Sequence, residues 1–381
     1  MNFSYSDEQA AIFDMAKTFG EVAITPNAYT WEKAGTIPRG FLKEIGSLGF
    51  GGIYTSGEYG GSGLSRLDAV LIFEALSRSC PSVAAFISIH NMCVWMVDSF
   101  GTETSKQKWL PKLCAFDKVA SYALTEPGSG SDAAALKTKA VRSDEGYRLT
   151  GTKAFISGGE FSDVYIVMTR TGDPGPKGIS AFLVEDGTEG LSFGAQEKKM
   201  GWRSQPTAMV QLDDCKVPGD ALLGKIGEGF TYAMKGLDGG RLNISACSLG
   251  GAQFALDQAA KYMGERTAFG KTLDQFQALQ FKLADMQIRL EAARTLLHKA
   301  AWKLDQQALD ATKYCAMAKA FVTDVSFDVA NDALQLLGGY GYLEDYGIEK
   351  IVRDIRVHQI LEGTNEVMRL ITARSVLAER N

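Results

Sequence analysis

The chain has 381 residues, a formal net charge of −5 and a hydrophobic content of 45%. This length is too great for one typical core and predicts two or three packed units, while the hydrophobic content excludes a disordered chain. The acidic balance argues against a nucleic-acid binder, which normally carries a basic excess.

The first hundred residues predict helices. Ser6 and Gln9 have the spacing of a capping box at a helix start, and a short second helix is expected to stop at Gly49. Residues 57–63 are rich in glycine but lack the lysine and the preceding strand of a phosphate-binding loop, so a packed turn is favoured. Ser65 predicts the start of another helix.

Residues 82–100 are apolar nearly all round, which predicts a buried helix that ends at Gly101. The polar residues inside this helix, Ser88, His90 and Asn91, need hydrogen-bond partners or a cavity. The apolar run is interrupted by these residues and is shorter than a transmembrane span, so no membrane insertion is predicted.

From about residue 115 to residue 218 the sequence is typical of β-structure. Runs of β-branched and aromatic residues alternate with turn clusters of glycine, proline and aspartate. These runs lie at residues 140–141, 147–150, 164–168, 178–185 and 209–212. They predict a compact antiparallel β domain that is inserted between helical parts.

The chain is predicted to become helical again after Gly224. One helix is marked by apolar residues whose spacing alternates four and three, the seam of a coiled-coil-like pair. These residues are Leu279, Leu283, Met286, Leu290, Ala293 and Leu297. Another long helix is expected from about residue 311 to residue 337. Such helices predict a four-helix bundle and an oligomer interface.

The predicted fold is therefore α+β and multidomain. We expect an N-terminal helical domain at 1–115, a middle antiparallel β domain at 116–225 and a C-terminal four-helix bundle at 226–381. Six cysteines without a CxxC pair and three histidines without metal-ligand spacing predict reduced, buried thiols and no metal site. Without a signal or transit pattern, we expect a soluble protein of the bacterial cytoplasm, or of the mitochondrial matrix if the chain is a mature eukaryotic one.

Two segments of the β region have the composition of ligand-facing loops. Residues 122–132 end a predicted strand in small and hydroxyl-bearing residues, whose N–H groups and hydroxyls can meet a ring or a phosphate. Phe155 lies beside Ser157 at another strand end, which suits an aromatic ligand. A surface turn and a core phenylalanine are the respective alternatives.

Three arginines are candidates for anion binding. Arg241 follows residues 238–240, where two glycines predict a flexible backbone that lets arginine reach a phosphate. Arg266 follows a helix, and Arg374 lies on the terminal helix. Taken alone, each is more often a solvated surface charge or a member of an ion pair. The histidines show no partners for a Ser-His-Asp triad.

Glu362 is a candidate for a site residue. It lies where two amphipathic runs meet, and Gly363 after it allows backbone shapes that other residues resist. Thr364 can cap the next helix, whose first turn carries Glu366. We expect Glu362 to stand on an elbow between helices and to point into a cleft; an ordinary solvated glutamate is the alternative.

Four segments, in order and spacing, resemble the acyl-CoA dehydrogenase family across the whole chain. They are 124–132, 266–270, 335–341 and 361–364. Further segments look like the branch of this family that oxidises isobutyryl-CoA in valine breakdown. They are 49–52, 60–68, 87–93 and 357–363.

The resemblance implies FAD held between the β domain and the bundle of a homotetramer, with each cofactor reaching a neighbouring subunit. The flavin-side positions are Leu124, Thr125, Ser131, Phe155, Ile156 and Ser157. The positions that match the neighbouring-subunit contact are Arg266, Phe276, Gln277, Gln335, Gly338 and Gly339, and a further cofactor contact matches Thr364 and Glu366. The positions that match the thioester contacts are Ser131, Asp238, Gly239, Gly240, Arg241 and Arg374.

By the same resemblance, Glu362 matches the base that takes the α-proton of the acyl thioester, while FAD takes the hydride from the β carbon. The N–H of Glu362 and a ribityl hydroxyl of the cofactor would stabilise the enolate oxygen. Burial beside the acyl chain is expected to raise the pKa of Glu362.

The implied function is desaturation of isobutyryl-CoA to methacrylyl-CoA, with electrons passed to electron-transferring flavoprotein. Phe86, Met92 and Trp95 are bulky enough to shorten an acyl pocket. One methylene is worth only about 1–3 kcal/mol of discrimination, so 2-methylbutyryl-CoA and other short-chain acyl-CoAs stay open as substrates. An acyl-CoA oxidase, which usually carries a further C-terminal domain, and a non-catalytic flavoprotein-like scaffold are the rival functions.

Overall fold

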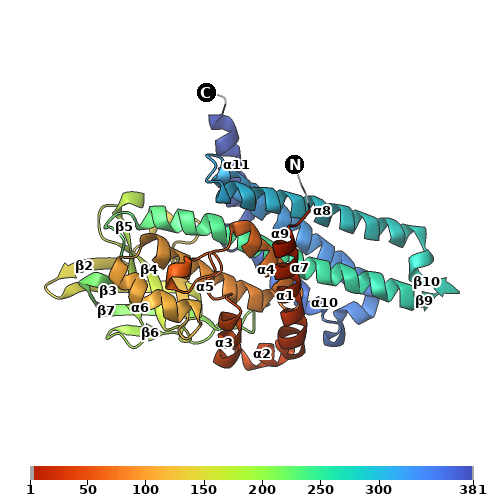
Figure 1. Cartoon of the computed structure of the whole chain (residues 1–381), viewed down its shortest axis with the longest axis horizontal. Helices are drawn as coiled ribbons and strands as arrows, with labels where there is room; N and C mark the ends of the chain where they lie inside the picture. Colours follow the sequence, from red (N-terminus) through yellow and green to blue (C-terminus); the bar gives the residue numbers. More distant parts are fainter. Residues whose placement is uncertain (1–3, 380–381) are drawn as a thin grey trace.

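The computed structural model describes residues 4–379, and its first part is helical (Figure 1). The helices of this part are α1 (Asp7–Phe19), α2 (Ala28–Ala34), α3 (Arg39–Ser47), α4 (Arg66–Ser77), α5 (Pro81–Phe100) and α6 (Glu103–Cys114). Capping boxes at Ser6 and Ser65 confirm both predicted helix starts. The glycine-rich segment 57–63 is a packed turn with one short 3-10 helix, as expected.

Helix α5 confirms the predicted buried helix, and Gly101 is its C-cap. His90 accepts from the N–H of Ala120 at Nδ1 (3.1 Å), and its Nε2 therefore donates to Leu113 O (3.0 Å). Asn91 bonds three backbone groups of its surroundings. In contrast to the prediction, α5 is long and apolar enough to cross a membrane by length and composition alone, but here it is a core helix.

The middle part is one sheet of eight strands. They are β1 (Ala120–Ala123), β2 (Lys139–Ser143), β3 (Gly146–Ser157), β4 (Val164–Arg170), β5 (Ile179–Glu185), β6 (Leu191–Phe193), β7 (Thr207–Pro218) and β8 (Leu222–Leu223). The order is β6-β7-β3-β2-β4-β5-β8, and β1 also pairs with β4. Four of the five predicted runs lie wholly in strands of this sheet, and the run at 178–185 matches β5 except for Gly178, which ends a 3-10 turn.

The prediction of a purely antiparallel sheet was wrong, because β4 pairs in parallel with β1 and, at one position, with β2. No hairpin joins β1 to β4. The whole β2–β3 ribbon separates them along the chain, and a long connection of this kind permits parallel pairing. Strand β1 confirms the strand expected before the loop at 124–132, whereas the short strands β6 and β8 were not predicted, since runs of two or three residues carry little periodicity.

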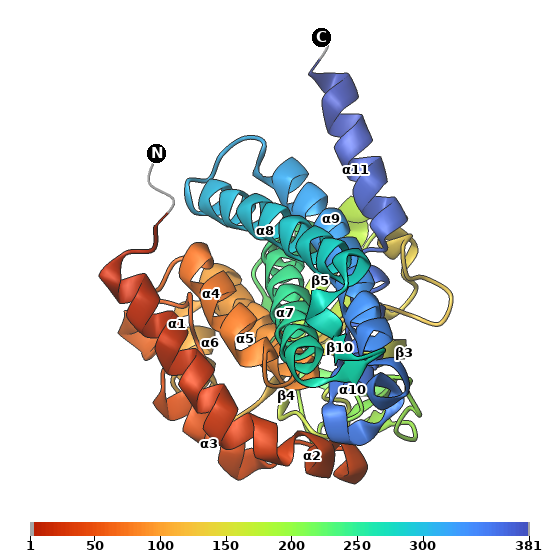
Figure 2. The same cartoon turned by 90° about the vertical axis from the view of Figure 1, so that its right-hand side faces the viewer.

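The C-terminal part contains the longest helices. They are α7 (Gly229–Glu265), α8 (Gln277–Asp305), α9 (Ala311–Leu337), α10 (Ile348–Arg356) and α11 (Asn365–Ala378). Helix α9 has the predicted bounds. Four of the six predicted seam residues of α8 are fully buried, namely Met286, Leu290, Ala293 and Leu297. A small ribbon of β9 (Thr267–Ala268) and β10 (Lys271–Thr272) follows α7. Helix α11 projects away from the body (Figures 1 and 2).

Helix α7 passes through the centre of the molecule, with α4 and α5 on one side and α8 and α9 on the other (Figure 2). It has 37 residues, and the prediction of flexible backbone at 238–240 was wrong because this segment lies inside it. Glycine costs about 1 kcal/mol in a helix relative to alanine, and close packing against neighbours outweighs that cost here. A Cβ at Gly251, for example, would approach Pro81 of α5 to 2.9 Å.

Candidate active site

The elbow predicted around Glu362 joins α10 to α11. After a short 3-10 turn at Val357–Gln359, the backbone enters the left-handed region at Glu362 (φ +54°) and stays there at Gly363 (φ +91°). The Thr364 hydroxyl then accepts from the N–H of Val367 and caps α11, which confirms the predicted cap. Glutamate rarely adopts positive φ, so the surroundings must hold this conformation.

The carboxylate of Glu362 packs on the bare backbone of α7. A Cβ at Gly240 would collide with Oε2 and lie 3.0 Å from Cδ, so only glycine leaves room for the group as it stands. Oε2 is buried and has no hydrogen-bond partner among residues 4–379. Burial raises the pKa of Glu362 to about 7, although Lys319 and Arg241 oppose the shift. A solvated surface glutamate is therefore excluded.

A stack of aromatic and guanidinium groups occupies the neighbouring face of α7. The guanidinium of Arg66 abuts Gly239, 3.6 Å from the ring centre of Tyr54 and 4.9 Å from that of Trp95. The Tyr54 hydroxyl accepts from Asn243 Nδ2 at 3.1 Å. Burial raises the pKa of Tyr54, and the charge of Glu362 adds to this shift, whereas Arg66 and Asn243 oppose it.

Sequence reasoning missed Tyr54, Arg66 and Asn243 as site residues. They come from a loop, the start of α4 and the middle of α7, and no spacing in the sequence relates them. One indication of this role was present in the sequence: Arg66 lies in the segment 60–68, which resembles the isobutyryl-CoA branch of the family. Two further polar atoms, the Tyr122 hydroxyl and Asn243 Oδ1, are buried without a partner in the described part of the chain. The site therefore contains unused hydrogen-bonding capacity.

Arg241 and Asp238 form a buried pair beside the elbow. Arg241 Nη1 lies 2.6 Å from Asp238 Oδ1, and Asp238 Oδ2 accepts from the Thr312 hydroxyl at 2.6 Å. Arg241 Nε also points at the carbonyl oxygen of Glu362, at 3.4 Å. We expected Arg241 to lie on a flexible backbone and to reach a phosphate. It is instead held by Asp238 and contacts the backbone of the elbow.

The loop after β1 is held by a buried ion pair. Lys153 is fully buried, and its Nζ donates to Glu126 Oε1 (2.8 Å) and to the carbonyl of Leu124 (3.0 Å). Glu126 also accepts from the N–H groups of Lys137 and Thr138. Although burial opposes ionisation, these hydrogen bonds lower the pKa of Glu126, so the carboxylate stays charged. The loop is rigid, as a ligand-binding wall requires.

Phe155 is 68% exposed and has a left-handed backbone (φ +59°), so the alternative of a core phenylalanine is wrong. Its neighbour Ile156 is buried in the core of the sheet, and Ser157 accepts at its carbonyl from Ser121. Ser131 is exposed on the loop after β1. This edge of the β domain presents an aromatic face and a hydroxyl to the outside.

Most of the other predicted residues lie at the far end of the molecule (Figure 1). Arg266, Gln335, Gly338 and Gly339 line a hollow of about 750 Å³ between the ends of α7, α8 and α9. Phe276 and Gln277 begin α8 near this hollow, and Phe269 beside them is 96% exposed. These residues do not share a site with Glu362 within one chain.

The remaining predicted residues lie on α11. Glu366 is exposed in its first turn. Arg374 is exposed on the projecting part of the helix, and its side chain forms no ion pair or hydrogen bond within residues 4–379. The structure therefore groups Glu362 with residues 238–241 and leaves Arg374 apart.

His358 is buried below the elbow and is neutral. Burial lowers its pKa to about 3. Trp202 Nε1, which can only donate, lies 3.0 Å from His358 Nε2, so Nδ1 carries the proton and donates to the Ser248 hydroxyl at 2.7 Å. His358 is therefore bonded to an indole N–H and not to a carboxylate, so it is not part of a Ser-His-Asp triad.

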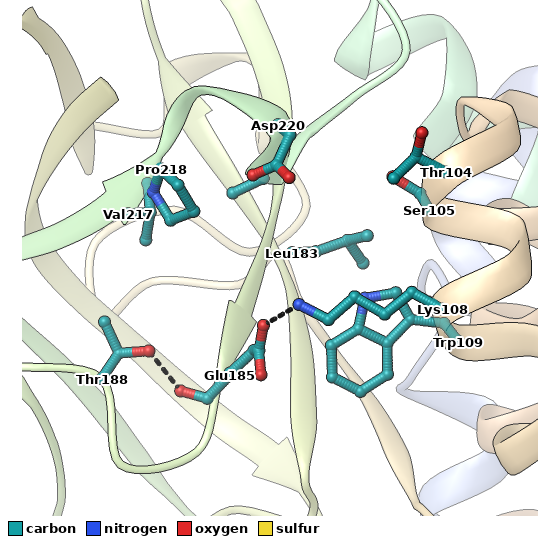
Figure 3. Close-up of a pocket in the computed structure, with 11 residues that line it drawn as sticks. Thr104, Ser105, Lys108, Trp109, Leu183, Glu185, Thr188, Val217, Pro218 and Asp220 are labelled. Carbon is teal, nitrogen blue, oxygen red and sulfur yellow. Dashed lines mark hydrogen bonds and ion pairs between the residues drawn. The ribbon is translucent and has the colours of Figure 1, made fainter. Parts of the chain in front are cut away.

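A second hollow, of about 70 Å³, lies between α6 and the sheet (Figure 3). Lys108 on α6 pairs there with Glu185 on β5, and Lys108 Nζ lies 5.1 Å from the ring centre of Trp109. The hollow is too small for a cofactor and contains none of the predicted residues. It marks a junction between the helical and β parts.

All six cysteines are buried and free, as expected.

Comparison with known proteins matches three family models along the chain. They are described as acyl-CoA dehydrogenase N-terminal domain at residues 6–117, middle domain at 121–215 and C-terminal domain at 227–377. The mitochondrial isobutyryl-CoA dehydrogenase of Bos taurus is 51% identical over 98% of this chain and 90% of the relative.

Solved structures give the same result. The butyryl-CoA dehydrogenase of Megasphaera elsdenii is 39% identical with a TM-score of 0.95, over 99% of this chain and 100% of the other. A chain from a study of the electron transferring flavoprotein of Acidaminococcus fermentans and flavin-based electron bifurcation is 42% identical, with a TM-score of 0.96 and coverage of 99% and 100%.

Proposed function

Because this chain belongs to the acyl-CoA dehydrogenase family, and is thus an FAD-dependent oxidoreductase that acts on short-chain acyl-CoA, we propose that its substrate is isobutyryl-CoA. The product would be methacrylyl-CoA, and the reaction would be a step of valine breakdown. The observation that carries the proposal is the buried, unpaired carboxylate of Glu362 on the bare backbone of Gly240. Such a group has no structural partner to satisfy and is available to a substrate.

The residues near the β domain fit the isoalloxazine end of FAD. Phe155 offers an exposed aromatic face, and the N–H groups of Thr125 and Ser131 have no hydrogen-bond partner among residues 4–379. Rigid donors beside an aromatic face suit a flat ring that is rich in acceptors. When bound, FAD supplies the acceptor for the hydride of the β carbon.

We propose that two chains share each FAD. The wall at Leu124 and Phe155 belongs to the β domain, whereas Arg266 caps the opposite end of α7. With 37 residues, α7 is about 55 Å long, which exceeds the reach of one dinucleotide. The hollow at Arg266 and Gly338 would then bind the phosphates or adenosine of a cofactor held mainly by a neighbouring subunit of a homotetramer, with Phe276, Gln277 and Gln335 beside it.

Glu362 would remove the α-proton of the thioester as the catalytic base. Its own N–H makes no hydrogen bond in the described part of the chain and is available to the thioester oxygen, where negative charge develops. Asp238 and Arg241 would hold the pantetheine side, and Tyr54 and Arg66 would bound the acyl side.

The acyl chain is tested with a panel of isobutyryl-, 2-methylbutyryl-, butyryl- and isovaleryl-CoA under anaerobic conditions. We expect isobutyryl-CoA to bleach the bound flavin fastest, because the chain is 51% identical to an isobutyryl-CoA dehydrogenase. A clear preference for isovaleryl-CoA would contradict the proposal, and no bleaching with any of the four would favour a non-catalytic scaffold.

We propose electron-transferring flavoprotein as the electron acceptor. A similar chain comes from a study of such a protein, which supports this choice. Turnover should therefore need that flavoprotein or an artificial dye and should proceed slowly with air alone. Rapid turnover with oxygen would identify an oxidase instead.

The rate of flavin reduction should depend on pH. The base acts in its ionised form, and burial raises the pKa of Glu362 to about 7. Below pH 7 the carboxyl is protonated, so the rate should fall about tenfold for each further pH unit, whereas above pH 8 it should level off. Stopped-flow bleaching at a saturating acyl-CoA concentration measures this limb. A rate that is constant from pH 5.5 to pH 8 would contradict the assignment of the base.

A further inference from the structure

The elbow contains two consecutive residues with left-handed backbone, Glu362 and Gly363. For a residue with a side chain this conformation is uncommon and persists only when neighbouring groups impose it. The carboxylate itself contributes nothing, because Oε2 has no partner among the described residues. The conformation must therefore be held through the backbone of the elbow and its flanking side chains.

Lys319, on α9, holds the backbone directly after Glu362. It is 0% exposed, and its Nζ donates to the carbonyl oxygen of Gly363 and to Asn365 Oδ1, each at 2.8 Å. It does not form an ion pair with Glu362, since no ion pair within residues 4–379 involves either residue. A buried cation thus binds the elbow at the left-handed glycine and leaves the carboxylate free.

The next turn of α9 holds both arms of the elbow. Asp324 Oδ1 accepts from Gln359, before the elbow, and from Asn365, after it, each at 2.7 Å. Thr323 accepts from the same Asn365 amide at 2.9 Å. Residues 359, 363 and 365 are therefore fastened to one face of α9. Glu362 lies between them, and its side chain makes no hydrogen bond among residues 4–379, although its carbonyl faces Arg241.

We propose that Lys319 is a positioning residue of the reaction: it clamps the elbow to α9 so that Glu362 faces the substrate, and it places a buried cation beside that base without pairing with it. This inference rests on the proposed role of Glu362 as the base. It assigns a function to a buried lysine that does not touch the reacting atoms.

The electrostatic surroundings of Glu362 agree with this role. Lys319 and Arg241 are the cations that oppose the burial of the carboxyl and lower its pKa, while Tyr54, Tyr122 and Cys247 are neutral groups that its charge affects from other sides. Burial lowers the pKa of Lys319 itself to about 8, so the ammonium is present at neutral pH. Its Nζ hydrogen bonds to carbonyl oxygens place this charge near the base without pairing with it.

The test compares Lys319→Met with Lys313→Met in the complete FAD-loaded protein. Lys313 lies on the same helix but pairs with Glu379 near the chain end, so it is a matched control. In Lys319→Met the acid limb of flavin reduction should move up by about one pH unit, since an opposite charge nearby is lost. At pH 9 the base is ionised in all variants, and wild-type Lys319 is largely an uncharged amine that still donates to the carbonyl of Gly363. The rate of Lys319→Met at this pH should therefore still be about tenfold lower, because the elbow is no longer held.

A purely structural role would reduce stability without moving the acid limb, and an unchanged limb in a folded Lys319→Met protein would overturn the proposal. If that variant does not fold, Asp324→Ala tests the clamp from its exposed side, because alanine has no oxygen to accept from Gln359 and Asn365. It should lower kcat without raising KM, and an unchanged kcat would overturn the clamp.

Failure of this inference can be separated from failure of the proposed function. The ionisation of Glu362 can be followed without turnover, by pH-difference infrared spectroscopy of the protonated carboxyl band that is missing in Glu362→Gln. A wild-type protein that oxidises no acyl-CoA would refute the proposed function. The infrared titration would still show whether Lys319→Met raises the pKa of this carboxyl, and no change would refute the inference alone.

Discussion

Replacing Glu362 by glutamine is expected to stop acyl-CoA oxidation while the protein stays folded and yellow. The amide has the same shape, so it fits on Gly240 as the carboxylate does. It cannot take a proton, and loss of a positioned base lowers the rate by roughly 10²–10⁴-fold. The fold should not suffer, because Oε2 of Glu362 has no hydrogen-bond partner in the described part of the chain and an amide is less costly to bury than a charge.

Anaerobic stopped-flow bleaching with isobutyryl-CoA measures this loss, and the flavin absorbance and the melting temperature show that the site is otherwise intact. Glu44→Gln is a suitable control, since Glu44 is an exposed residue on α3. A Glu362→Gln protein that bleaches at nearly the wild-type rate would rule out Glu362 as the base.

Replacing Lys153 by methionine is expected to unfold the β domain or to empty it of FAD. The change leaves the buried carboxylate of Glu126 with backbone donors but without its cation. Removal of one partner from a buried ion pair costs about 3–5 kcal/mol. The loop at 124–132 would lose its anchor at the same time, because Lys153 also holds the carbonyl of Leu124.

Thermal unfolding and the ratio of flavin to protein measure both effects. The double variant Lys153→Met, Glu126→Gln should recover part of the lost stability, since it leaves no unpaired charge. The stability that Glu126 contributes is present above its unfolded pKa of about 4.3 and is lost as the pH falls through its lowered folded pKa. A Lys153→Met protein with wild-type stability and full FAD content would show that the pair is dispensable.

The fold could be predicted where periodicity was strong. The seam from Leu279 to Leu297 indicated α8, and the helix expected at 311–337 matches α9. Helix α7 could not be predicted in the same way, because its glycines read as turn residues when considered alone. Their reason for being in a helix is tertiary: Gly239 and Gly240 make room for Arg66 and Glu362, which are distant in the sequence.

The candidate site shows the same division. The elbow at Glu362 could be predicted from local rules, since Gly363 permits the turn and Thr364 caps the next helix. The groups that give Glu362 its properties could not, because Lys319 and Arg241 lie on two other helices and reach the elbow only through packing. The resemblance alone led to the expectation that the carboxylate is buried. The physical cause of the burial is that the carboxylate packs on Gly240 of α7, a contact that the sequence does not reveal.

The length of α7 has a consequence for how the protein responds to dilution. If each FAD bridges two chains, the cofactor acts as a ligand of the assembled state alone and stabilises assembly by mass action. A separated subunit would keep Glu362 and the substrate-binding residues around it. It would have only one of the two walls of each FAD site, because a neighbouring subunit supplies the other. Flavin content would then report the degree of assembly, and a mutation at the far end of α7, near Arg266, would silence the active site of a neighbouring chain rather than its own.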